Sequence, residues 1–204
     1  MSIGKNNLVW MFVFFAVLTW SAIEPFDRLT WWLEVIPALL GLVLMSITRK
    51  RFPLTSLVYI LILVHAIILM VGGHYTYAEV PLGDWWSELS GGTRNNYDKL
   101  GHLAQGFIPA MIAREILLRN RVIAKRGWLA FLVLSIVLAI SAFYELIEWW
   151  AALVSAEGAD SFLGTQGYIW DTQSDMMWAL GGALLALVTL SRLHDRQIKA
   201  LATG

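Results

Sequence analysis

Six apolar stretches divide the chain, and each is close to the ~20 residues that an α-helix needs to cross the hydrocarbon core of a bilayer. They cover about 8–23, 30–48, 54–72, 97–118, 128–150 and 171–190. Backbone N–H and C=O groups in lipid must be bonded within their own segment, so these stretches are predicted to be helices. The pattern predicts an all-α membrane protein. We expect a six-transmembrane helix bundle with two long outer loops, 73–96 and 151–170, in a single polytopic domain over residues 1–204.

Composition supports a membrane protein over a soluble one. Hydrophobic residues make up 58% of the chain and charged residues only 15%, whereas soluble proteins carry about 25% charged residues. The net charge is zero, which gives no indication of nucleic-acid binding. The chain has no cysteine, so disulfides and zinc–thiolate sites are excluded.

The basic residues between the stretches predict the orientation. Eleven of them fall on one side of the membrane, at the N-terminus and after the second, fourth and sixth stretches. Only Arg28, Arg94 and Lys99 fall at or near the other side. Because loops rich in Lys and Arg stay in the cytoplasm, both termini are expected to be cytoplasmic and both long loops to lie outside.

Acidic side chains and one histidine gather at the outer ends of the last three stretches. Asp98, His102 and Gln105 are spaced four and three residues apart, which places them on one face of a helix. Acid pairs at the same spacings occur at the end of the fifth stretch and the start of the sixth. We expect one pocket, open to the outer side, that is lined by Asp98, His102, Glu145, Glu148, Asp171 and Asp175.

Not all of these acids need a functional explanation. Asp98 and Asp171 begin helices, where a carboxylate caps free N–H groups and complements the helix dipole. Glu145 and Glu148 lie near the C-terminal end of a helix, one turn apart, where the dipole and their mutual repulsion both disfavour two negative charges. A cation, a shared proton or His102 must therefore compensate this pair.

Two kinds of chemistry fit the pocket. In the first, all six ionisable residues are candidate ligands of a divalent cation such as Mg, Mn or Ca. In the second, no metal takes part, and His102, Glu145 and Asp175 act as general acids and bases. Five more side chains are candidates for ligand contacts: Lys99, Gln105, His74, Tyr144 and Gln173. Gln105 has the alternative of bonding to a neighbouring helix.

Four segments carry a resemblance to known proteins: HYTY at 74–77, YDKLGH at 97–102, YELIEW at 144–149 and WDTQSDM at 170–176. Through them the chain resembles the YjdF-like family of bacterial inner-membrane proteins. More distantly, its second half is similar to VanZ-like proteins of the cell envelope, which begin this region with Asp-Lys-x-x-His, as Asp98, Lys99 and His102 do here. The resemblance implies a multi-pass inner-membrane protein with its outer loops in the periplasm.

The function expected from these features is a cell-envelope protein whose periplasmic pocket binds a cation or a polar lipid-linked ligand, with hydrolase or transferase activity as one form. The expected partners are membrane lipids and a lipid-linked or envelope substrate, and the oligomeric state stays open. A small transporter or channel is one alternative, and a non-catalytic assembly or regulatory protein is another.

The orientation is testable by labelling, because the native chain lacks cysteine. A single cysteine at Ser161 is expected to react with an impermeant thiol reagent in intact right-side-out vesicles, and one at Lys125 only after the vesicles are opened. The reverse result would overturn the orientation.

Overall fold

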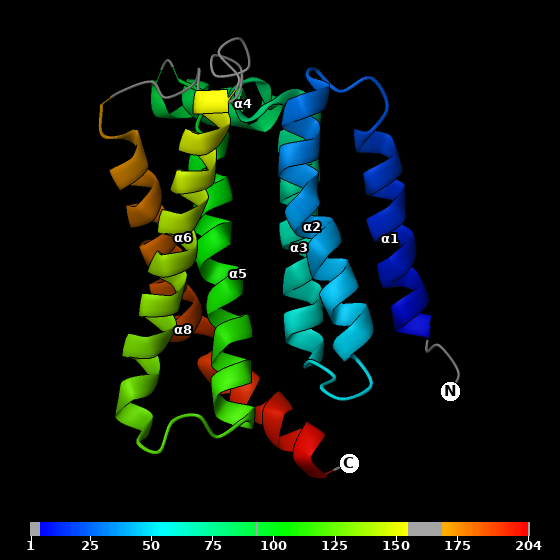
Figure 1. Ribbon diagram of the computed structural model, residues 1–204, viewed down its shortest axis with the longest axis vertical. Helices are drawn as coiled ribbons and strands as arrows, with labels where there is room; N and C mark the ends of the chain where they lie inside the picture. Colours follow the sequence, from blue (N-terminus) through cyan, green and yellow to red (C-terminus); the bar gives the residue numbers. More distant parts are fainter. Residues whose placement is uncertain (1–4, 93, 155–168, 204) are drawn as a thin grey trace. The chain divides into compact units, whose positions relative to one another are not determined.

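The computed structural model describes residues 5–92, 94–154 and 169–203, and all regular secondary structure in this part of the chain is helical (Figure 1). Two short 3-10 helices, Tyr77–Glu79 and Arg126–Trp128, accompany the α-helices. The seven α-helices are α1 (Lys5–Ser21), α2 (Arg28–Thr48), α3 (Ser56–Tyr75), α4 (Pro81–Ser90), α5 (Tyr97–Arg119), α6 (Leu129–Val154) and α8 (Asp171–Thr203). The all-α prediction is confirmed.

Four of the described helices are long and apolar enough to cross a membrane: α2, α3, α6 and α8. The apolar part of α1, Asn7–Ser21, is shorter than a full span. Helix α5 is long enough, but its sequence carries Asp98, Lys99, Arg114, Glu115 and Arg119. All six predicted stretches are thus helices, and the count of six spans stays a prediction.

Helix α8 differs most from the expected boundaries, because it continues to Thr203 instead of ending near Leu190. Its 33 residues reach about 50 Å at 1.5 Å per residue, which exceeds the ~30 Å hydrocarbon core. The apolar run ends where charged residues begin, but the helix does not, because Arg, Gln, Lys and Ala all favour continued helix. This extension carries residues whose contacts with the rest of the fold were not predicted from the sequence.

The segment 73–96, expected as a loop, contains helix α4. Pro81 stands at its first turn, and Gly91 ends it in the left-handed conformation, with φ 69°. Leu82, Trp85 and Trp86 are exposed, as expected for a short helix held at a membrane interface by its tryptophans. Most of the other predicted loop, 151–170, lies outside the described residues.

The chain divides into two compact units. Unit 1 comprises residues 1–52 and 60–97, and unit 2 comprises residues 53–59 and 98–204. Helix α3 therefore begins in unit 2 and continues in unit 1. Whether the units form one membrane domain stays a prediction.

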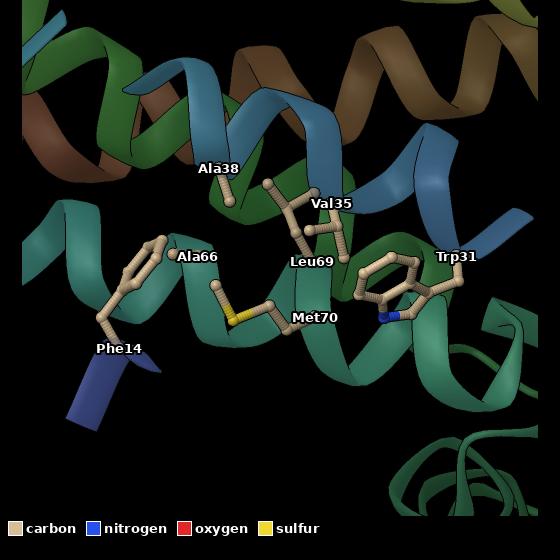
Figure 2. Close-up of a cluster of buried hydrophobic side chains, with 7 residues drawn as sticks. All are labelled: Phe14, Trp31, Val35, Ala38, Ala66, Leu69 and Met70. Carbon is tan, nitrogen blue, oxygen red and sulfur yellow. The ribbon is translucent and has the colours of Figure 1, made fainter. Parts of the chain in front are cut away.

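Unit 1 is held together by apolar contacts among α1, α2 and α3. Its buried cluster consists of Phe14, Trp31, Val35, Ala38, Ala66, Leu69 and Met70 (Figure 2). The Trp31 indole N–H donates to the Ser21 hydroxyl at 3.1 Å, so the one polar atom of this ring is also satisfied. Asp27 caps α2 by accepting the Thr30 backbone N–H at 2.7 Å, and this hydrogen bond lowers the pKa of the Asp27 carboxyl. Asp27 thus has a structural role.

In unit 2, α5 and α8 pack closely because glycines remove side chains from their contact. A Cβ built on Gly106 would lie 1.7 Å from the Ala179 carbonyl oxygen, and one on Gly182 would lie 2.1 Å from that of Leu103. Small residues commonly allow helices in membranes to approach in this way. The adjacent Gly181 takes no part in this contact, since a Cβ on it would meet nothing within 4 Å.

We expect Gly106→Ala and Gly182→Ala each to destabilise the protein by about 1–3 kcal/mol, because the added methyl group forces the two backbones apart. Gly181→Ala is the matched control, since it adds the same methyl group to open space on the same helix. Thermal unfolding in detergent measures the three variants. A Gly182→Ala protein as stable as Gly181→Ala would contradict the close contact.

Candidate functional site

His102 lies at the centre of a polar cluster near the start of α5 and is buried. Its Nε2 lies 3.3 Å from Asp98 Oδ1, one turn earlier on the same helix, and 3.8 Å from Asp175 Oδ2 on α8. Its Nδ1 lies 3.2 Å from the side-chain oxygen of Gln105. The predicted shared face of Asp98, His102 and Gln105 is confirmed, and Gln105 bonds within its own helix instead of to a neighbour.

Helix packing brings Asp175 to His102. His102 faces Asp175 near the start of both helices, and Glu115 faces His194 farther along both, so α5 and α8 run parallel. The contacts of Gly106 and Gly182 lie between these two pairs. Distant sequence segments therefore meet because two helices can approach unusually closely.

Helix α6, which packs against α8, supplies the remaining wall of the cluster. The Glu145 side chain is buried, and the Thr172 hydroxyl at the start of α8 is within hydrogen-bonding reach of it. The Tyr144 ring lies edge-on to the His102 ring, with 6.5 Å between centroids. Glu148 is near enough for its charge to act on His102.

The predicted residues converge to a large extent. Asp171 is buried in the first turn of α8, and its charge acts on both Glu145 and Asp175. Asp98, His102, Glu145, Glu148, Asp171 and Asp175 thus belong to one electrostatic cluster in unit 2.

The other candidate ligand contacts lie in different surroundings. Lys99 is half-buried next to Asp98, whereas Gln173 is exposed on α8. His74 belongs to unit 1, where its Nδ1 lies 3.1 Å from the Ser21 carbonyl oxygen and its ring packs on Trp20 at 4.5 Å. These contacts give His74 a packing role. The predicted ligand contacts of Lys99 and Gln173 stay predictions.

Carboxylates are concentrated in this cluster, and three of them are deeply buried: Glu145, Asp171 and Asp175 are each at most 8% exposed. Buried carboxylates are costly unless they are paired and fully hydrogen-bonded. Yet Glu145 Oε1 and Asp175 Oδ1 are buried without a hydrogen-bond partner in the described part of the chain. Such unpartnered oxygens suit an additional ligand.

Asp98, His102 and Asp175 have the arrangement of a metal site. One donor atom from each lies within 4.8 Å of the other two. Gln105 faces the other ring nitrogen and holds the imidazole in place, which is the usual role of a residue behind a metal ligand. The same geometry also suits an imidazolium, because both ring nitrogens face oxygen atoms.

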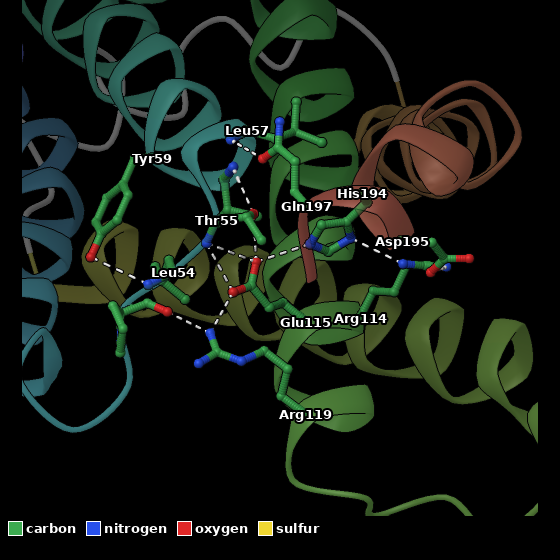
Figure 3. Close-up of polar contacts among 12 residues, drawn as sticks. Leu54, Thr55, Leu57, Tyr59, Arg114, Glu115, Arg119, His194, Asp195 and Gln197 are labelled. Atoms are coloured by element: carbon green, nitrogen blue, oxygen red, sulfur yellow. Dashed lines mark hydrogen bonds and ion pairs between the residues drawn. The ribbon is translucent and has the colours of Figure 1, made fainter. Parts of the chain in front are cut away.

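A second polar cluster, which the sequence reading did not find, lies farther along α5 and α8 (Figure 3). Its centre is Glu115, which is completely buried. Glu115 accepts from the Thr55 hydroxyl at 2.7 Å, from His194 Nε2 at 2.9 Å and from the Arg119 guanidinium at 2.7 Å. Both of its oxygens are therefore satisfied.

The hydrogen bonds of this second cluster fix the proton on His194. Arg114 donates to His194 Nδ1 at 3.1 Å, and a guanidinium can only donate, so Nδ1 must accept. His194 therefore carries its proton on Nε2 and donates it to Glu115. Arg114 also pairs with Asp195 at 2.7 Å.

Two residues of this cluster were not predicted to be buried. Arg114 is 5% exposed and bonded to α8. His194 is completely buried, although it lies beyond the predicted end of the sixth stretch. His194 was missed because it lies past the apolar end of the sixth stretch. The residues after the sixth stretch have an amphipathic pattern, in which a buried position such as His194 recurs at helical spacing among exposed ones. This pattern is a signal that could have identified His194.

Comparison with known proteins decides the family. The family described as "Predicted membrane protein (DUF2238)" matches residues 6–196. The chain belongs to this family. It is 55% identical over 190 residues to the Inner membrane protein YjdF of Escherichia coli (strain K12), with 92% of this chain and 91% of that relative covered. No solved structure matches the chain.

Membership confirms the YjdF-like resemblance and makes the chain an integral inner-membrane protein. It therefore places both polar clusters in a protein whose surroundings are largely lipid. The more distant resemblance to VanZ-like proteins stays a prediction.

The second cluster generates a stability prediction. Glu115→Ala should destabilise the protein by about 3–5 kcal/mol, because it leaves Arg119 and His194 facing an empty, buried position. Glu88→Ala, which removes an exposed carboxylate on α4, is the control and should change stability by less than about 0.5 kcal/mol. Thermal unfolding in detergent compares them. Equal unfolding temperatures for the two variants would contradict the structural role of Glu115.

Proposed function

We propose that this inner-membrane protein binds a divalent cation, Mg, Mn or Ca, through Asp98, His102 and Asp175. We further propose that the site faces the periplasm and holds the polar head group of a lipid-linked envelope ligand for hydrolysis or group transfer. The single observation that carries the proposal is the convergence of these donor atoms within 4.8 Å of one another beside buried, unpartnered carboxylate oxygens.

The donor set supports a hard or intermediate cation. Carboxylate oxygens are the ligands that Mg, Mn and Ca prefer, and one imidazole favours Mn among the three. Helix bundles build such sites from inward-facing acids and a histidine on neighbouring helices, as α5, α6 and α8 would here.

Location supports a role at the membrane surface. The basic asymmetry of the sequence predicts that the starts of α5 and α8 lie on the outer side. A bound divalent cation would polarise a phosphoryl or carbonyl oxygen of a head group that reaches this depth. The chain itself would contribute Lys99 beside Asp98 as a cation for an anionic head group, and the Tyr144 ring as an apolar wall next to His102.

A metal-free site is the second candidate, and the position of His102 supports it. Both ring nitrogens face oxygen atoms, so a protonated imidazole would pair with Asp98 and Asp175 and donate to Gln105. His102, Glu145 and Asp175 would then act as general acid and bases without a cation.

Transport has less support from the helix packing. A transporter needs a polar path across the membrane, and polar clusters do occupy both ends of α5 and α8. Between them, however, the backbones of the two helices are in direct contact at Gly106 and Gly182, which leaves no room along this pair.

Thermal unfolding in detergent tests the cation proposal. At a free concentration 100 times its Kd, a cation that binds only the folded protein adds about 2.7 kcal/mol to the free energy of unfolding. We expect a rise in unfolding temperature with Mg, Mn or Ca for the wild type, and none for His102→Ala or Asp175→Asn. Met177→Ala, on an exposed side of α8, is the control and should respond as the wild type does.

The stabilities of the same variants without metal give a second readout, in which the two substitutions should have opposite effects. Asp175→Asn should be more stable than the wild type without metal, because it removes one buried negative charge that the charges of Asp98, Asp171 and Glu145 repel. His102→Ala should be less stable, because it removes the only imidazole. Wild-type protein indifferent to every cation would refute the metal site and leave the metal-free one.

A further inference from the structure

Three buried side-chain atoms have no hydrogen-bond partner in the described part of the chain: Ser141 Oγ, Glu145 Oε1 and Asp175 Oδ1. All three are oxygens, and all three belong to α6 or α8 in unit 2. Buried oxygens of this kind are rare in folded proteins, and each needs an explanation such as a bound ion or water. Their shared location indicates one cause.

Ser141 differs from several other hydroxyls on the helices of the chain. The hydroxyls of Ser46, Thr189 and Ser191 each donate to the carbonyl oxygen four residues earlier, the usual bond for such side chains in a helix. Ser141 Oγ makes no such bond, although its side chain is completely buried. Its hydroxyl oxygen is therefore available to another ligand.

The three oxygens lie in a consistent arrangement. Ser141 and Glu145 are four residues apart, so they lie one above the other on the same face of α6. Helix α6 packs on α8, and the charges of Glu145 and Asp175 act on each other across that contact. Asp175 directs Oδ2 toward His102, which leaves Oδ1 as its second, unused donor.

We propose that a second divalent cation binds between α6 and α8 to Ser141 Oγ, Glu145 Oε1 and Asp175 Oδ1, with Asp175 bridging it to the cation at His102. This inference rests on the proposed function, because the bridge requires the first site. The second site has oxygen donors alone, so it selects a hard cation. Two cations joined by a carboxylate are a common way to bind a phosphoryl group, which makes a phosphorylated lipid-linked head group the ligand class that the pair would take.

Manganese binding in detergent tests the proposal, with the ions counted by the loss of the free Mn²⁺ signal in electron paramagnetic resonance. The wild type is expected to bind two Mn²⁺ ions per chain. Ser141→Ala should bind one Mn²⁺ ion with wild-type affinity, and its affinity for the second ion should fall by about tenfold or more. Because the Ser141 hydroxyl has no partner to lose, this variant should fold normally. Ser191→Ala removes a hydroxyl with an ordinary helical bond and should still bind two ions.

The possible outcomes separate the two proposals. A single Mn²⁺ per chain in both wild type and Ser141→Ala would overturn the second site and leave the first. Two ions with unchanged affinities in Ser141→Ala would overturn the placement at Ser141. No binding by any of the proteins would overturn both proposals.

Discussion

The close contact between α5 and α8 is the interaction on which the rest of unit 2 depends. Gly106 and Gly182 let the two backbones approach until any added Cβ would collide with a carbonyl group of the other helix. Two parallel helices held at this separation must face each other along their length. The contact therefore brings His102 to Asp175 near the start of both helices and Glu115 to His194 farther along. One packing constraint thus generates both polar clusters.

The two clusters follow the same physical rule with opposite results. A buried charge is tolerated when its hydrogen bonds are complete, and Glu115 meets that condition with partners on every side. The cluster at His102 does not, since Glu145 and Asp175 each keep a buried oxygen without a hydrogen-bond partner among the described residues. The complete hydrogen bonds of Glu115 fix α5 to α8 and to the start of α3. The cluster at His102 keeps buried oxygens that the proposed cation would bind, and unsatisfied groups of this kind each need an explanation.

Local sequence patterns predicted the helices and the residues that share a helix face. They predicted contacts between distant segments less well. Apolar runs gave all six long helices, and spacings of three and four placed Asp98, His102 and Gln105 on one face. The Glu115–His194 pair was missed because it joins residues 79 positions apart, one of them beyond the end of an apolar run. The rotation of α8 about its axis decides whether Gly181 or Gly182 makes the close contact. The sequence does not reveal that rotation, because the two glycines are adjacent.

The most direct test of the cation site is the nitrogen coupling of bound Mn²⁺, measured by pulsed electron paramagnetic resonance on the protein in detergent. The account predicts one ¹⁴N coupling from a directly bound imidazole, present in the wild type and in His74→Ala and absent in His102→Ala. His74 is the suitable control because it packs in unit 1 against Trp20 and Ser21. A bound Mn²⁺ without nitrogen coupling, or a coupling that persists in His102→Ala, would contradict the account.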